Sequence, residues 1–101
     1  MMQVSLTIGH NVGNEQRLDT PAVCQAVTSL LGVEAFTAIP CYGMWRGMAE
    51  SSTRVEIVCD EQTAVSIEQE VPFLAHMLGQ EAIMCEVRAS HASFVAAPVM
   101  A

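Results

Sequence analysis

The spacing of apolar residues changes repeatedly along this chain, and the order of those changes constrains its fold more than any other feature. Residues 3–8 alternate strictly between aliphatic and polar side chains, which is typical of a strand with one face on a core. Residues 53–59 and 82–89 alternate in the same way. We therefore expect three strands that are each buried on one side.

Two stretches between these strands have the spacing of amphipathic helices. The first is expected to start with Thr20 as the N-cap and Pro21 as the first helical residue, and to end at Gly32. The second follows Asp60, a residue that caps helices well, and is expected to end at Gly79.

Two prolines modify this pattern. Pro40 lies among the β-prone residues 35–45 and cannot donate a hydrogen bond to a neighbour, so this strand is expected at a sheet edge or with a bulge. Pro72 removes a backbone donor inside the second helix. We expect it to kink that helix or to split it after Glu70.

The order strand, helix, strand, strand, helix, strand predicts an α+β fold of the ferredoxin-like class. It has a four-stranded antiparallel sheet with both helices on one face. Residues 1–101 are long enough for one such domain and no more. The residues around Phe94 are expected either to add a short extra C-terminal strand or to dock as a tail.

The charge balance excludes several classes of function. The chain has 11 acidic residues, 4 arginines and no lysine, and its net charge is −7. It lacks the clustered basic residues that nucleic acids and anionic membranes require, and it has no lysine for a phosphate loop or a Schiff base. No apolar stretch is long enough to span a bilayer, and the N-terminus does not have the pattern of a signal peptide, so a cytoplasmic location is expected.

The cysteines and histidines do not form a recognisable metal motif. The four cysteines are far apart in sequence and are expected to be reduced thiols that pack as small apolar groups. A metal site would require His10, His76 or His91 to converge with carboxylates. We expect no metal and no other cofactor.

Three polar segments are expected at one end of the sheet, because the predicted topology brings them together. They are "GHNVGN" after the first strand, "GMWRGMAESS" in the hairpin, and "GQE" after the second helix. We call this end the rim. The candidate binding residues on it are His10, Asn11, Trp45, Arg46, Glu50, Ser51, Gln80 and Glu81.

Two interpretations of the rim remain open. In one, Trp45 only closes the end of the core, Arg46 is solvated, Gly47 makes the turn, and Glu50 or Glu81 accepts backbone amides from neighbouring loops. In the other, His10 is a general base, Glu50 or Glu81 an acid or orienting group, and Arg46 an anion clamp. A monomer of this size has little concavity, so a pocket between subunits is the more natural site.

The chain is expected to self-associate as a dimer or trimer. The predicted strand edge is open, one sheet face lacks a helix, and the tail "SFVAAPVMA" is apolar enough to need a covering surface. The sequence favours a self-associating binding or interaction module with a small-molecule or protein partner. The alternative is a small enzyme with its active site at the rim or at a subunit interface.

Three stretches together, "TIGHNVGN", "WRGMAESS" and "GQEAIMCEV", resemble a family of small proteins from actinobacteria and their phages that has no established activity. The resemblance implies a bacterial or prophage origin. The predicted fold is also similar to that of the trimeric nitrogen-regulatory PII and CutA proteins, although the nucleotide-binding motifs of PII are missing. That similarity concerns architecture alone.

Overall fold

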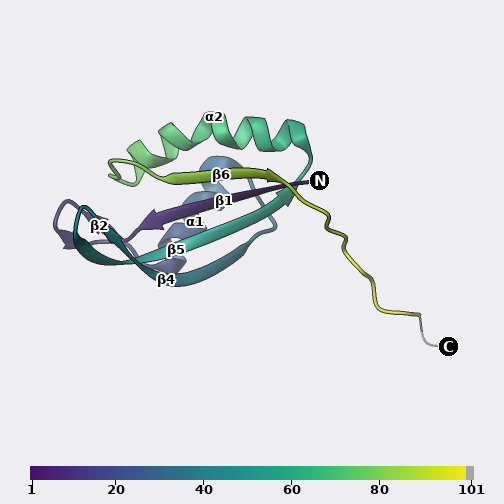
Figure 1. Cartoon of the computed structure of the whole chain (residues 1–101), viewed down its shortest axis with the longest axis horizontal. Helices are drawn as coiled ribbons and strands as arrows, with labels where there is room; N and C mark the ends of the chain where they lie inside the picture. Colours follow the sequence, from purple (N-terminus) through teal and green to yellow (C-terminus); the bar gives the residue numbers. More distant parts are fainter. Residues whose placement is uncertain (100–101) are drawn as a thin grey trace.

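A computed structural model describes residues 1–99 and has the expected α+β ferredoxin-like architecture (Figure 1). Its main sheet is antiparallel with the order β4-β5-β1-β6, and two helices pack on one face. A small separate hairpin follows the first strand. In chain order the elements are β1 (Met2–Gly9), β2 (Asn11–Val12), β3 (Glu15–Gln16), α1 (Thr20–Leu31), β4 (Thr37–Trp45), β5 (Met48–Cys59), α2 (Glu61–Met77) and β6 (Met84–Ala89).

The core lies between the helices and the two central strands, β1 and β5. Alternate residues of these strands face the helices, as their period predicted, and each buried aliphatic side chain contributes about 1.5–3 kcal/mol. The opposite face of the sheet has no helix over it (Figure 1). The core contains Val4, Leu6, Ile8, Val23, Val27, Val55, Ile57, Ala64, Ile67, Val71 and Leu74.

Helix α1 begins one residue earlier than predicted. Asp19, rather than Thr20, is the N-cap, and its carboxylate accepts a hydrogen bond from the Ala22 amide at 2.9 Å. Thr20 is the first helical residue, and its hydroxyl instead lies 2.9 Å from the Thr53 hydroxyl. The prediction that the helix stops at Gly32 is confirmed, because Gly32 has a positive φ of 67° at the C-cap.

Helix α2 is capped by Asp60, as predicted, and runs without a break through Pro72. The expected split after Glu70 is wrong. The proline ring removes the donor that would bond the Glu68 carbonyl, and both residues are exposed, so water can satisfy that carbonyl. The cap bond from the Thr63 amide lowers the pKa of Asp60. The helix ends at Met77, and Gly79 follows with a φ of 67°.

The strand boundaries differ from the prediction mainly at the rim. Strand β5 starts at Met48 instead of Thr53, because hairpin pairing continues to Trp45 and Met48 beyond the end of the helix layer. Strand β4 is at the sheet edge, as Pro40 predicted. Strand β6 starts two residues later than expected, at Met84.

Residues 90–99 form no strand. The Ser90 amide still donates a hydrogen bond to the Met1 carbonyl at 2.9 Å, and residues 91–99 extend away from the body of the molecule (Figure 1). The optional extra C-terminal strand is therefore wrong for this part of the chain. Within the same described range, no helix has both the length and the apolar character needed to cross a membrane.

Candidate functional site

A groove of about 700 Å³ lies on the helix-free face of the sheet, at the rim. The ends of β1, β4 and β5 form its floor, the β2–β3 hairpin and the α2–β6 turn form its sides, and the tip of the β4–β5 hairpin closes one end. Its size is typical of small-molecule pockets. The principal lining residues are Thr7, Gly9, Asn11, Gly43, Trp45, Arg46, Met48, Glu50, Ser52, Gln80, Glu81 and Met84.

Glu50 places a carboxylate in the groove against the backbone of β1. A Cβ atom on Gly9 would lie 2.6 Å from both carboxylate oxygens, so only glycine leaves the room that Glu50 occupies. The Glu50 Oε2 atom also accepts a hydrogen bond from the Asn11 amide at 3.2 Å. Gly43 of β4 is paired with Glu50 of β5. No atom lies within 4 Å of the position that a Cβ atom on Gly43 would take, which leaves open space beside the carboxylate.

Asn11 connects two of the three rim segments to each other. Its amide donates to Glu50 of the β4–β5 hairpin, and its carbonyl accepts a hydrogen bond from the Gln80 side chain at 2.9 Å. Gln80 belongs to the α2–β6 turn. These bonds join segments 39 and 69 residues apart in sequence, and they fix the position of the three rim segments relative to one another.

The hairpin tip is a tight two-residue turn. Trp45 pairs with Met48, and the two residues between them, Arg46 and Gly47, have φ values of 51° and 77°. Positive φ at both positions is the pattern of a type I′ turn, whose twist matches that of a hairpin. Arg46 is the only non-glycine residue with positive φ in residues 1–99, and this conformation is unfavourable for arginine.

The tip contacts the α2–β6 turn through Glu81. The Trp45 Nε1 atom donates to the Glu81 carboxylate at 3.3 Å, and the Arg46 guanidinium lies 3.5 Å from the same oxygen. The guanidinium also stacks over the indole ring, 5.7 Å from its centre. Because Arg46 and Glu81 are largely exposed and Trp45 is about half exposed, these contacts orient the tip but contribute little to the free energy of folding.

Two of the predicted rim residues do not line the groove. His10 is 5% exposed, and its Nε2 atom lies 2.7 Å from the Thr53 hydroxyl, which faces the core side of the sheet. Ser51 pairs with Tyr42, and its carbonyl accepts a hydrogen bond from the His10 amide at 2.9 Å. The structure thus brings six of the eight candidates together, and it places His10 in a buried chain of side chains that continues to Thr20.

The groove floor contains residues that the sequence analysis did not select. Thr7 and Ser52 lie there with their side chains on the helix-free face, beside Met84 of β6. The Thr7 hydroxyl is buried and has no hydrogen-bond partner within the described chain. The period-2 pattern of β1 already assigned Thr7 to the outer face. What it could not show is that the outer face becomes hollow at this end.

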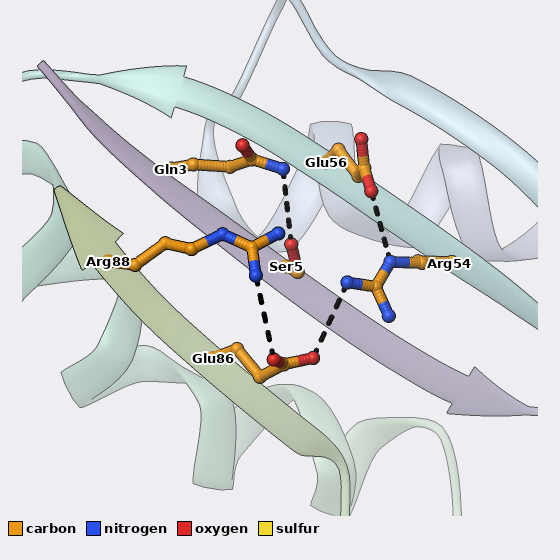
Figure 2. A network of polar contacts seen from close by, with 6 residues as sticks. All are labelled: Gln3, Ser5, Arg54, Glu56, Glu86 and Arg88. Atoms are coloured by element: carbon orange, nitrogen blue, oxygen red, sulfur yellow. Dashed lines mark hydrogen bonds and ion pairs between the residues drawn. The ribbon is translucent and has the colours of Figure 1, made fainter. Parts of the chain in front are cut away.

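The helix-free face beyond the groove is covered by paired charges (Figure 2). Arg54 lies between Glu56 at 3.0 Å and Glu86 at 3.4 Å, and Arg88 lies 3.9 Å from Glu86. Hydrogen bonding to Glu56, and then the charge of Glu86, raise the pKa of Arg54. Arg54 is therefore neutralised by its neighbours and does not supply a free positive charge to the groove.

The groove offers two carboxylates, one guanidinium and one indole ring, arranged around a floor of small residues. Arg46 and Glu81 pair with each other, so Glu50 is the charged group without an ionic partner among the groove residues. No group of three or more metal-binding side chains occurs in residues 1–99. This arrangement suits a flat, partly apolar ligand that carries a positive charge.

No protein-family model and no curated protein matches the chain. Among solved structures, it is similar to a phage SAM lyase in complex with S-methyl-5′-thioadenosine. The TM-score is 0.61 and the sequence identity 16%, over 86% of this chain and 79% of the other. At this identity the similarity shows a shared fold.

Proposed function

We propose that this chain binds S-adenosylmethionine in the groove and cleaves it to S-methyl-5′-thioadenosine. The observation that carries the proposal is the Glu50 carboxylate, held in the groove between Gly9 and the Asn11 amide. A sulfonium is a cation without hydrogen-bond donors, so a fixed carboxylate beside apolar surface can attract it. The neighbour of the same fold holds a thioadenosine compound, which supports this ligand class.

The other lining residues fit the remainder of such a ligand. Trp45 and the two methionines Met48 and Met84 supply apolar surface for a purine ring, and Gly43 leaves room beside the carboxylate. In the proposed cleavage, the bond between the sulfur and Cγ of the methionine part breaks. An oxygen of the substrate's own carboxylate forms a bond to Cγ as the bond to sulfur breaks, so the methionine part leaves as a lactone. The sulfur keeps the electron pair and loses its charge, and no further reactant is consumed. This function corresponds to the small enzyme that the sequence left open as an alternative. Glu50, rather than His10, is the charged group that contacts the substrate.

Two ligands that differ in charge test this assignment. Isothermal titration calorimetry measures the Kd of S-adenosylmethionine and of the uncharged thioether S-methyl-5′-thioadenosine, and chromatography follows formation of the thioether. We expect Glu50→Gln to weaken S-adenosylmethionine binding by at least about tenfold. The thioether should lose less than about threefold.

The variant Glu34→Gln removes the same charge outside the groove and is the matched control. It should leave both dissociation constants and turnover unchanged. Equal losses for the charged and uncharged ligands in Glu50→Gln, or no binding of either ligand by the unmodified protein, would overturn the proposal.

A second candidate function is that of a self-associating interaction module. The observation that favours it is the apolar surface of the β4–β5 hairpin beyond the helices, where Tyr42 and Met44 are largely exposed. Native mass spectrometry of the purified chain tests it. A dimer or trimer of the 10.9 kDa chain is expected, and bound ligand mass in that oligomer would support both candidate functions.

The proposal includes a cytosolic location in a bacterial or phage-infected cell, in line with the family resemblance.

A further inference from the structure

The chain carries an apolar segment with no covering surface. Residues 91–99 follow the end of β6 and lie extended outside the body of the molecule (Figure 1). Phe94, Val95 and Val99 are 83%, 88% and 98% exposed, the highest values among the large apolar side chains of residues 1–99. A segment of this composition has too few polar groups to be a well-solvated linker.

The sheet has an open edge that matches this segment in its apolar, uncharged chemistry. Strand β4 pairs only with β5, so its outer backbone groups have no strand partner in the described chain. It contains nine residues and spans about 30 Å when extended, and the segment after β6 is long enough to lie along it. Ile39, Tyr42 and Met44 are exposed on β4.

Charge favours the same pairing. The chain has a net charge of −7, which opposes contact between most surfaces of two copies. Strand β4 has no charged residue, and His91 is the only titratable side chain in residues 91–99. The other sheet edge, β6, is less suitable because it has six residues and carries Glu86 and Arg88.

We propose that residues 91–99 of one copy add to the sheet of a second copy as a strand beside β4. Each copy then donates one segment and accepts one, reciprocally in a dimer or head to tail around a trimer. Pro40 and Pro98 each lack one donor, and an edge strand tolerates such a loss. The inference deepens the proposed self-association.

The added strand also extends the floor of the groove. Gly43 of β4 lies in that floor, so a strand on the outer side of β4 places alternate side chains on the same face, next to Gly43. A second copy would in this way supply part of the floor of the ligand site. The contact between subunits and the groove are then parts of one site.

The test combines oligomer mass with cross-linking in the full-length protein. A photoreactive benzoylphenylalanine replaces Phe94, and copies labelled with ¹⁴N and ¹⁵N are mixed before illumination. We expect cross-links from position 94 to residues 37–45 of the other isotope. We also expect a chain that ends after residue 90 to have the mass of a monomer in light scattering.

A point variant distinguishes loss of the strand contact from other effects of removing the segment. Val95→Glu adds a charge to the exposed segment and should shift the oligomer toward monomer by at least about tenfold in its dissociation constant. Gln62→Glu adds the same charge on the exposed side of α2 and should not change it. A monomeric full-length chain, an oligomer that persists without the segment, or cross-links confined to one isotope would overturn the inference. None of these readouts requires S-adenosylmethionine, so a failed ligand assignment leaves this test intact.

Discussion

The carboxylate of Glu50 occupies the space that a side chain on Gly9 would fill. A Cβ atom at Gly9 would lie 2.6 Å from each carboxylate oxygen and 2.7 Å from the carboxylate carbon. Gly9 belongs to β1 and Glu50 to the neighbouring strand β5. The Asn11 amide donates a hydrogen bond to the same carboxylate. The direction of the charged group in the groove therefore depends on the absence of a side chain on β1.

The variant Gly9→Ala should move Glu50 without unfolding the domain. The methyl group meets the far end of a flexible side chain, which can swing away and give up its bond to Asn11. We expect the free energy of unfolding to fall by about 1–2 kcal/mol in urea titrations. We expect the Kd for S-adenosylmethionine to rise about tenfold, as in Glu50→Gln.

Gly43→Ala is the control for this prediction, because a Cβ atom there has no neighbour within 4 Å. It leaves Glu50 in place, so the ¹H–¹⁵N resonance of the Asn11 amide should keep its position in this variant and shift in Gly9→Ala. An unshifted Asn11 resonance in Gly9→Ala would show that Glu50 does not depend on Gly9.

Thr53→Val should destabilise the protein more than its similar size suggests. The Thr53 hydroxyl is fully buried and lies 2.7 Å from the His10 ring and 2.9 Å from the Thr20 hydroxyl. Its loss leaves a buried imidazole nitrogen unsatisfied, which costs about 1–3 kcal/mol. Urea titration measures the loss. Thr53→Ser keeps the hydroxyl and should retain most of the stability, and equal losses in the two variants would contradict this role.

The stability of the domain should decrease in acid through the cap of α2. The hydrogen bond from the Thr63 amide lowers the pKa of Asp60 below its usual 3.8. Because the folded pKa is lower than the unfolded one, the contribution is complete above about pH 4 and is lost as the pH falls through the folded pKa. Thermal melts between pH 2 and pH 6 should show a smaller decrease for Asp60→Asn, which caps the helix without a charge. Identical pH profiles would contradict the assignment.

The spacing of the apolar residues was sufficient to predict the fold, because apolar residues recur at the positions of each strand and helix that face the core. The alternation in β1 assigned the core faces correctly, and Pro40 correctly indicated an edge strand. The period was not sufficient where burial ends. Residues 48–52 extend β5 beyond the helices and do not alternate between apolar and polar side chains, so the start of the strand was not predicted.

The candidate site was predicted in part for a similar reason. Chain order and topology correctly indicated that Asn11, Glu50 and Gln80 meet at one end of the sheet. They could not show whether a side chain near the end of a strand faces the core or the helix-free side of the sheet. His10 continues the inward parity of β1 and is buried, while Gly9 continues the outward parity and opens the groove.

Thr7→Val should stabilise the protein, in contrast to most substitutions of buried residues. The Thr7 hydroxyl is buried at the groove floor with no hydrogen-bond partner in residues 1–99, and valine has nearly the same shape. Removing this unsatisfied group should raise the free energy of unfolding by about 1 kcal/mol, which corresponds to about 4–8 °C in Tm. Thr7→Ser keeps the hydroxyl and should give no such gain. A lower Tm for the valine variant would show that the hydroxyl is satisfied in solution, and calorimetry with S-adenosylmethionine would then test whether the ligand affinity changes with it.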